Sequence, residues 1–447
     1  MNLKLTILFL ILLTFSTNCI SSAKGENASN VEEKNKIALR RAKENIEKFR
    51  KGNAVVSLDR FKQKDLKIKI RQISHDFKFG CYLKIDDLDR KHAGLYENYF
   101  KRLFNYAVVG TYWDVTENKR GEHFWTNFEK EVAMANRNNW RIQTAPILWG
   151  SNQAGTPDWL PKEKTELENV LDARIKRYFE NYSGAAEDVE IVNENLSLEP
   201  DIFADRVGKI YIETAFRQAK SLSPNSRLII NDYGVFGSVS ANNYNSDKYF
   251  ALISELAEKQ IPFDTVGIQS HANREWYSPA DVAEKLDRYA TPGKPVQISE
   301  FSAQTKNYDD RASYESILGN YRSGVWTDEK QAEFYREFYT VAFGNPNVEA
   351  IVQWGLDDAR AWLPGIGLID ENGAPKPNYT VLDQLINREW RTNVELDLKD
   401  VKNAEFRGFF GVYEIEIFSG GKSLAKQNFE LKKNTPNNFV FSQNLPR

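Results

Sequence analysis

The feature that most constrains the fold of this chain is a series of short apolar runs separated by longer, helix-prone segments. One intervening helix is clear, because Tyr249, Leu252, Ile253, Leu256 and Ala257 recur with helical spacing. Short apolar runs that alternate with helices are typical of parallel strands buried on both faces. The eight runs are Phe77–Cys81, Ala107–Tyr112, Ile142–Ile147, Val189–Asn193, Leu228–Asn231, Thr265–Gln269, Val296–Glu300 and Ala350–Trp354.

Eight strand–helix units fit a (β/α)8 TIM barrel, a fold of about 250 residues with room for insertions. A doubly wound open sheet is the alternative, but no glycine-rich phosphate loop follows the first run. The chain has 447 residues, of which 41% are hydrophobic, so it can bury a large core. We therefore predict an α/β fold with a catalytic barrel over residues 76–390.

The two flanks of the predicted barrel have a different pattern. Leu66–Arg71 alternates strictly, and Tyr413, Ile415 and Ile417 alternate with glutamates before a Gly-Gly turn. Each pattern leaves one apolar face that needs a cover. We predict that residues 24–75 form a helix and a β flank, that residues 391–447 form a β extension, and that the two flanks pack together as a small β-rich unit.

The first residues are typical of an export signal. Lys4 supplies the charge, Leu5–Phe15 is almost wholly apolar, and small residues precede Lys24. This stretch is too short to span a bilayer, which takes about 20 apolar residues. We predict a signal peptide at residues 1–23 and a secreted, cell-surface or periplasmic protein. A lipoprotein signal that ends before Cys19, with a lipid anchor on that cysteine, is the alternative.

Charge and composition exclude several classes of function. The 60 Lys and Arg residues against 62 Asp and Glu give a net charge of −2, so nothing indicates a nucleic-acid partner. Removal of the signal leaves Cys81, which we expect to be a buried, inert thiol, and no intramolecular disulfide. The four histidines show no metal-ligand spacing. We expect no metal, no cofactor, no transmembrane span and a monomer.

The predicted strand ends carry the chemistry. Active sites of these barrels lie at the C-terminal ends of the strands. A polar residue at one such end is ordinary, because loops begin there, but five strands agree here. Their ends are Asn193-Glu194, Asn231-Asp232-Tyr233, Gln269-Ser270-His271, Glu300 and Trp354.

Two carboxyl groups at one barrel mouth are what glycoside hydrolysis requires. One carboxylic acid protonates the leaving oxygen, and one carboxylate meets the oxocarbenium-like carbon. We assign Glu194 as acid/base and Glu300 as nucleophile of a retaining mechanism. Asn193 is placed to bind a sugar 2-hydroxyl, and His271 to hold Glu300 ionised. The chain is also rich in aromatic residues, whose flat faces stack on sugar rings.

At these residues the sequence resembles glycoside hydrolase family 10, the endo-β-1,4-xylanases. Residues 191–194 (IVNE) are similar to the acid/base motif and residues 296–301 (VQISEF) to the nucleophile motif. Segments 231–233, 267–271, 354–358 and 375–377 are similar to further family segments in the same order. The resemblance implies a polysaccharide substrate and further substrate-binding or supporting residues, namely Gln269, Tyr233, Trp113, Trp149, Trp354 and Trp362.

The chain also departs from the family pattern. Val108, Val109 and Tyr112 stand where the family has Glu, Asn and Lys, Ala145 replaces a His, and Ser302 replaces an acidic residue. The first four positions are among those that grip sugars on the non-reducing side. The resemblance makes xylan the first expectation for the substrate. The replaced positions make another β-glycan its rival. A carbohydrate-binding pseudoenzyme at the cell surface is the alternative function, although both predicted catalytic carboxylates are present.

Overall fold

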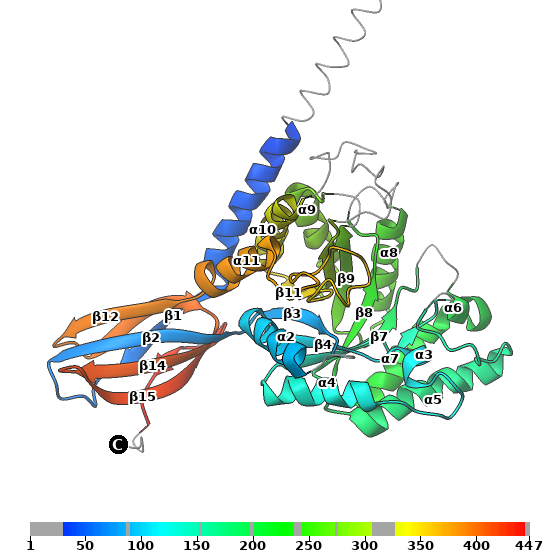
Figure 1. Ribbon diagram of the computed structural model, residues 1–447, viewed down its shortest axis with the longest axis horizontal. Helices are drawn as coiled ribbons and strands as arrows, with labels where there is room; N and C mark the ends of the chain where they lie inside the picture. Colours follow the sequence, from blue (N-terminus) through cyan, green and yellow to red (C-terminus); the bar gives the residue numbers. More distant parts are fainter. Residues whose placement is uncertain are drawn as a thin grey trace, which may run out of the picture.

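A closed parallel barrel forms the larger part of the molecule (Figure 1). The computed structural model describes residues 30–85, 90–151, 154–196, 201–236, 244–272, 276–305 and 327–442. The strands neighbour one another in the order β5-β4-β3-β11-β10-β9-β8-β7, and pairing of β5 with β7 closes the ring. Each of the eight predicted runs supplies one barrel strand. The barrel prediction is confirmed, and the open sheet is wrong.

The barrel strands are β3 (Lys78–Leu83), β4 (Tyr106–Gly110), β5 (Arg141–Ala145), β7 (Asp188–Asn193), β8 (Arg227–Asp232), β9 (Thr265–Ala272), β10 (Val296–Ala303) and β11 (Val348–Gln353), with a short β6 (Leu148–Trp149) beside β7. The helices are α2 (Arg90–Leu103), α3 (Trp113–Thr116), α4 (Thr126–Arg137), α5 (Lys164–Tyr182), α6 (Ile202–Val207), α7 (Ile210–Leu222), α8 (Tyr244–Glu258), α9 (Pro279–Tyr289), α10 (Asp328–Gly344), α11 (Pro377–Gln384) and the π-helical turn η1 (Leu385–Glu389). None of the helices in the described ranges is long and apolar enough to cross a membrane.

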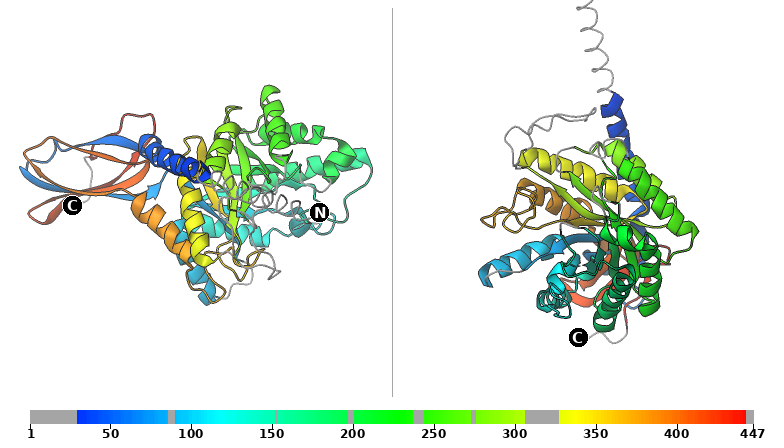
Figure 2. Two further views of the ribbon diagram at one scale, coloured as in Figure 1. Left: turned by 90° about the horizontal axis from the view of Figure 1, so that it is seen from above. Right: turned by 90° about the vertical axis from the view of Figure 1, so that its right-hand side faces the viewer.

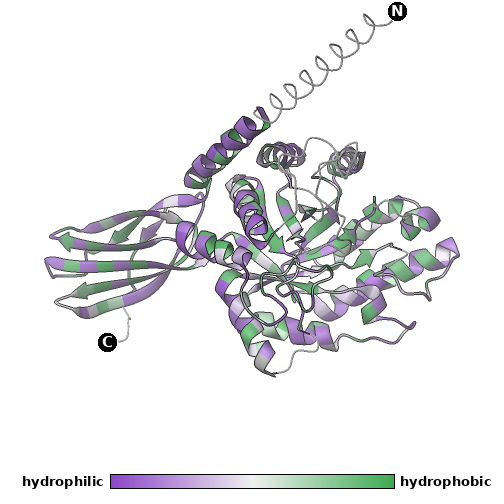
Figure 3. Ribbon diagram, turned by 45° about the horizontal axis from the view of Figure 1, so that its top comes forward, coloured by the Kyte–Doolittle hydropathy of each residue, from purple (hydrophilic) through white to green (hydrophobic). Residues whose placement is uncertain are grey.

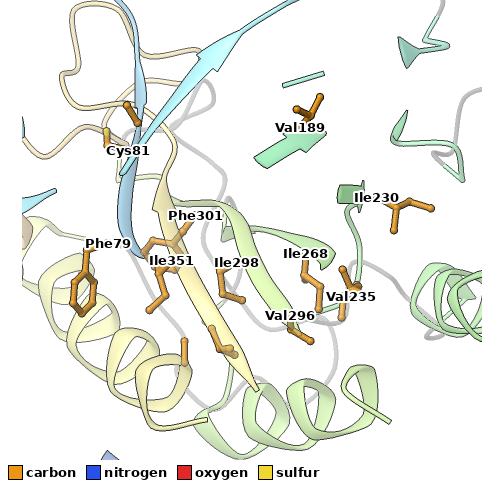
Figure 4. Packing of buried hydrophobic residues seen from close by; sticks show 14 of the residues in the cluster. Phe79, Cys81, Val189, Ile230, Val235, Ile268, Val296, Ile298, Phe301 and Ile351 are labelled. Atoms are coloured by element: carbon orange, nitrogen blue, oxygen red, sulfur yellow. The ribbon is translucent and has the colours of Figure 1, made fainter. Parts of the chain in front are cut away.

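The apolar core lies between the strands and the surrounding helices. Figure 4 shows Phe79, Ile298, Phe301 and Ile351 within it, together with Cys81. Helices present apolar faces to this layer and polar faces outward (Figure 3). Burial raises the pKa of the Cys81 thiol well above its usual range, so this cysteine is the buried thiol expected from the sequence.

The inside of the barrel is polar near the N-terminal ends of its strands. Lys78 pairs with Asp188, and the Tyr106 hydroxyl lies 2.7 Å from Asp188 Oδ2 and 2.9 Å from Gln143 Oε1. These side chains come from alternate positions of strands whose other residues face the helices. The buried charges are thus paired and hydrogen-bonded at the N-terminal end of the barrel, where residues contribute to stability and the active site does not lie.

The flanks form two small sheets beside the barrel (Figures 1 and 2). One contains β1 (Lys51–Ser57), β13 (Asn403–Phe409) and β16 (Asn438–Phe439), in the order β13-β1-β16. The other contains β2 (Asp65–His75), β12 (Asn393–Lys399), β14 (Gly411–Ser419) and β15 (Lys422–Leu431), in the order β12-β2-β14-β15. The two sheets share a separate apolar core that includes Val56, Ile68 and Ile415. Pairing of N-terminal with C-terminal strands confirms the predicted β-rich unit.

A helix at residues 30–49 connects this unit to the barrel. Asn35 Oδ1 accepts hydrogen bonds from Ser278 Oγ at 2.6 Å and from the Ala280 amide at 3.0 Å, which caps the start of α9. A Cβ on Gly344 would come within 2.6 Å of the Ala42 carbonyl oxygen, so glycine permits close helix packing there. The predicted signal peptide and Cys19 lie outside the described residues.

Candidate active site

Glu194 follows β7 at the C-terminal mouth of the barrel, in an unusual backbone conformation. Its φ of 51° lies in the left-handed region that residues other than glycine rarely adopt. The Glu194 amide donates to the Asn231 carbonyl at 2.9 Å, and the Leu196 amide donates to Asp232 Oδ2 at 3.0 Å. The end of β8 therefore holds this turn in place, which is typical of strain kept at a functional site.

A chain of hydrogen bonds links Glu194 to Glu300 across the mouth. Gln269 Nε2 donates to Glu194 Oε1 at 2.8 Å and to Asn193 Oδ1 at 3.2 Å. Asn231 Nδ2 donates to Asn193 Oδ1 at 3.0 Å and to Glu300 Oε1 at 3.1 Å. Strand register explains these contacts, because Asn193 pairs with Asn231 and Gln269 pairs with Glu300. The two glutamates thus share one rigid frame of amide side chains.

His271 contacts the other oxygen of Glu300. Its Nε2 lies 3.2 Å from Glu300 Oε2, and its Nδ1 lies 2.8 Å from Ser302 Oγ. The Tyr277 hydroxyl donates to the His271 carbonyl at 2.7 Å. Both oxygens of Glu300 therefore have a partner. The contact with His271 is the one expected from the sequence.

The two glutamates have different electrostatic surroundings. Burial and the nearby charge of Glu300 raise the pKa of Glu194 from 4.5 to about 7, although the Gln269 hydrogen bond opposes the shift. Burial, with the charge of Glu194, also raises the pKa of Asp232 to about 8. Glu190, which lies deeper in the barrel, has a pKa raised well above its usual range by burial and by Glu300. Anionic charge at this mouth is costly, so Glu194 keeps its proton to a higher pH than an ordinary glutamate does.

Aromatic side chains surround the mouth. Trp354 stacks on Tyr82 with ring centroids 4.5 Å apart, and Trp149 lies 5.9 Å from Tyr112. Trp362 is 52% exposed, and its ring meets that of His271 edge-on at 5.0 Å. These rings are candidates for stacking on sugar faces.

The loop that carries Trp362 is anchored by a buried cation. Lys376 Nζ lies 3.1 Å from Asp358 Oδ2 and 3.0 Å from the Gly365 carbonyl oxygen, and both charged side chains are buried. Thr305 and Gln331 donate to the same carbonyl at 3.2 and 2.8 Å. The position of Trp362 next to His271 thus depends on an interior ion pair.

Trp113 and Tyr233, also named from the sequence, have different surroundings. Trp113 is 2% exposed, donates to Glu117 Oε2 at 3.0 Å and packs 5.8 Å from the Trp159 ring. It has no free face for a sugar, so of the two roles expected for it, substrate binding or support, this position fits support. Tyr233 is half-buried directly after β8, where its amide donates to Asp232 Oδ1 at 2.8 Å.

Two of the replaced family positions, Val108 and Ala145, lie in an apolar cluster inside the barrel, whereas Val109 faces the main core between strands and helices. Val108 and Ala145 are buried in one cluster with Tyr106, Val352 and Trp354, against which Tyr82 packs. In the described part of the chain, no group of three or more His, Cys, Asp or Glu side chains could hold a metal ion. The polar half of the mouth, from β7 to β10, therefore faces an aromatic and apolar half.

Asn231 and Tyr82 are site residues that sequence reasoning did not assign. Asn231 stood within a quoted strand-end segment, and its position one residue after the apolar part of β8 could have indicated an inward-facing amide. Tyr82 falls at the end of β3, where the alternation of Lys78 and Gly80 with apolar residues places it on the inner face.

Comparison with known proteins agrees with this geometry. The sequence model described as "Glycosyl hydrolase family 10" matches residues 70–384. The chain belongs to this family. It is 29% identical to endo-1,4-beta-xylanase B of Thermotoga neapolitana, over 66% of this chain and 85% of that protein. It is 24% identical to endo-1,4-beta-xylanase 3 of Arabidopsis thaliana, over 83% of this chain but only 46% of that longer protein.

Solved structures show the same relationship for this family 10 hydrolase. Xylanase 10B of Thermotoga maritima superposes with a TM-score of 0.60 at 27% identity, over 70% of this chain and 96% of that one. Xylanase 10B of Thermotoga petrophila, solved in complex with xylobiose, gives a TM-score of 0.60 at 27% identity, over 70% and 95%. The chain is thus a glycoside hydrolase of the xylanase family, distant from these relatives in sequence.

Proposed function

We propose that this family 10 hydrolase cleaves a β-1,4-linked polysaccharide, xylan or a related β-glycan, with retention of configuration. The contrast between its two mouth carboxyl groups carries the proposal. Glu194 has a pKa raised to about 7, whereas Glu300 receives a partner on each oxygen, Asn231 at 3.1 Å and His271 at 3.2 Å. One group is suited to be the acid and the other the nucleophile.

In the first step, Glu194 gives its proton to the glycosidic oxygen as the bond from that oxygen to the anomeric carbon breaks. A Glu300 carboxylate oxygen bonds to the same carbon, which forms a covalent glycosyl-enzyme. In the second step, the Glu194 carboxylate takes a proton from water while the water oxygen attacks the anomeric carbon and releases Glu300. This sequence requires the two carboxyl groups to lie about 5 Å apart.

Two observations support the proposed substrate class: the names of the related proteins and the side chains at the barrel mouth. The relatives compared above are named xylanases, and one was solved with xylobiose. Trp362, which is 52% exposed, supplies a ring face for stacking along a glycan, and the half-buried Tyr82 stacks on the buried Trp354 at the same mouth. Val108 and Ala145 cannot form hydrogen bonds to sugar hydroxyls, so discrimination between β-glycans is expected to be weaker on that side.

Reducing-sugar release from linear xylan, substituted xylans, mixed-linkage β-glucan, cellulose and mannan tests the proposal. We expect release from at least one β-1,4-glycan, no release by the Glu300→Ala variant, and unchanged release by Glu255→Gln, which alters an exposed carboxylate on α8. Binding without release from any polymer would instead support a carbohydrate-binding pseudoenzyme. If the protein neither bound nor cleaved any of these polymers, the proposal would be contradicted.

We also propose that the protein is exported to the cell surface, the periplasm or the medium. Lys4 and the apolar run Leu5–Phe15 support export, and Cys19 is the attachment point in the lipid-anchored alternative. Mass spectrometry of the mature N-terminus tests this proposal, and an intact Met1 in the mature protein would contradict it.

A further inference from the structure

A buried cation lies behind the aromatic half of the barrel mouth. Arg174 on α5 is 2% exposed, and its Nη2 donates to the carbonyl oxygen of Thr111, the residue before Tyr112. Its Nη1 donates to Thr116 Oγ1 at 3.0 Å, and the Thr116 hydroxyl donates in turn to the Tyr112 carbonyl oxygen at 2.9 Å. Arg174 therefore holds the peptide groups on both sides of Tyr112.

The same side chain reaches the segment that carries Trp149. Arg174 Nε lies 3.5 Å from the carbonyl oxygen of Ile147, two residues before Trp149. The ring centroids of Tyr112 and Trp149 lie 5.9 Å apart. The two rings thus stand on separate segments that one guanidinium group joins from behind.

The surroundings of Arg174 are unusual for a buried charge. Among the described residues, its partners are two carbonyl groups, one hydroxyl group and the ring faces of Trp113 and Trp125, whose centroids lie 5.4 and 5.1 Å from the guanidinium carbon. Burial lowers the pKa of Arg174 to about 9, although the charge of Glu117 opposes the shift. An apolar side chain would fill this space without the cost of burying a charge. The backbone groups that Arg174 holds therefore explain its presence better than core stability does.

Tyr112 lies close to the catalytic carboxyl groups. Burial raises the pKa of its hydroxyl well above the usual range, and the charges of Glu300 and Glu194 are among those that add to the shift. Gly110 leaves room for the ring, because a Cβ there would lie 2.7 Å from Tyr82 Oη and 3.2 Å from Tyr112 Cε2. Tyr112 therefore borders the part of the mouth where a sugar bonded to Glu300 would lie.

We propose that Arg174 is a positioning residue that fixes the rings of Tyr112 and Trp149 against the sugar next to the catalytic carboxyl groups. This role rests on the proposed function and names what holds the aromatic wall of its sugar site. Tyr112 precedes the four-residue helix α3 and has no side-chain capping bond, so neither strand pairing nor capping sets its orientation. Arginine suits the role because its planar guanidinium donates in several fixed directions, whereas a lysine ammonium is a compact point charge.

Three variants of the full-length protein test this role by kinetics. Thr116→Val keeps the side-chain shape and removes the hydroxyl between Arg174 and Tyr112, and Arg174→Lys keeps the charge without the planar group. Lys176→Met, the control, removes an exposed cation from the same helix. On the shortest oligosaccharide that the wild type cleaves, the first two variants should raise KM about threefold to tenfold, the loss of one hydrogen bond, and change kcat less than about twofold. A merely structural role would lower the active fraction, and so kcat, and leave KM unchanged.

A double-mutant cycle with Tyr112→Ala shows whether the effect passes through this ring. We expect Thr116→Val to raise KM less than about 1.5-fold in the Tyr112→Ala background, because the ring that it positions is gone. Equal effects of Thr116→Val in both backgrounds would overturn the positioning role, and so would an unchanged KM in a folded Arg174→Lys protein. If Arg174→Lys does not fold, Thr116→Val decides alone.

Fluorine NMR of the fluorotyrosine-labelled protein separates this role from the proposed function. The chain has 20 tyrosines, and the signal that disappears in Tyr112→Phe identifies Tyr112. We expect this signal to shift or broaden in Thr116→Val and Arg174→Lys and to stay unchanged in Lys176→Met. An unmoved signal in the first two variants would overturn the positioning role even in a protein that cleaves polysaccharide. If the wild type cleaved no glycan, the proposed function would fail, while the signal would still decide whether Arg174 positions Tyr112.

Discussion

The raised pKa of Glu194 predicts that this residue costs the protein stability in alkaline solution. Its pKa is about 7 in the folded protein, against 4.5 as its ordinary value, chiefly because of burial and the charge of Glu300. Between pH 4.5 and 7 the folded state holds a proton that the unfolded chain has lost. The free energy of unfolding therefore falls as pH rises through this window.

The size of the effect follows from the shift. A pKa difference of this size corresponds to about 3 kcal/mol, present in full above pH 7 and absent below pH 4.5. Glu194→Gln keeps the volume and an oxygen that can accept from Gln269 Nε2, but it cannot ionise. It also removes one charge that raises the pKa of Asp232. We expect Glu194→Gln to be more stable than the wild type by about 3 kcal/mol at pH 8, and equally stable at pH 4.5.

Urea-induced unfolding of both proteins at the two pH values measures this difference. Glu255→Gln is the control, because Glu255 is exposed and pairs with Lys259, which lowers its pKa. This variant should gain no stability at pH 8. A stability difference between Glu194→Gln and wild type that does not change with pH, or a loss at pH 8, would refute the account of the Glu194 environment.

Four further predictions concern the reaction and the substrate. The first sugar product should keep the β configuration, as followed by proton NMR, and an α product would mean inversion and carboxyl groups about 6.5–9.5 Å apart. Glu194→Ala should slow polymer cleavage by about 10²-fold or more but affect aryl glycosides with good leaving groups far less; equal losses on both would contradict its acid role. Linear xylan should not be clearly superior to other β-glycans in kcat/KM, since Val108 and Ala145 give no hydrogen bonds; clear superiority would defeat that reasoning. Lys376→Met combined with Asp358→Asn removes both charges of the buried Lys376–Asp358 ion pair. It should raise KM on long polymers while kcat on a small aryl glycoside stays the same, and an unchanged KM would show that the loop needs no such anchor.

The sequence predicted the elements of the site better than its interactions. Glu194, His271 and Glu300 were assigned from their places at predicted strand ends, and Gln269 was assigned by resemblance; the structure brings all four to one mouth. Trp113 was chosen by resemblance alone, and it is buried. Position along a strand can be read from periodicity, whereas the burial of a side chain after the strand depends on the loop and helix that fold over it.

The contacts between side chains from distant segments could not be predicted from the sequence. The hydrogen bonds of Asn231 join β8 to β7 and β10, and the ion pair of Lys376 joins two parts of the segment after β11. Local pattern does not contain these pairings, because each depends on how the closed barrel aligns neighbouring strands. Strand register, once known, explains most of them.

What the sequence by itself determined was the order of strands and helices, the alternating flanks and the positions of two glutamates 106 residues apart. These features follow from local periodicity, because each residue is sorted between core and surface by its immediate neighbours along the chain. Only the tertiary structure decided that β1 pairs with β13, that Lys78 faces the interior of the barrel, and that Glu194 carries a pKa near 7 while Glu300 has two hydrogen-bond partners. Burial and charge at the mouth arise from residues far apart in the chain, so they exist only once the barrel has closed.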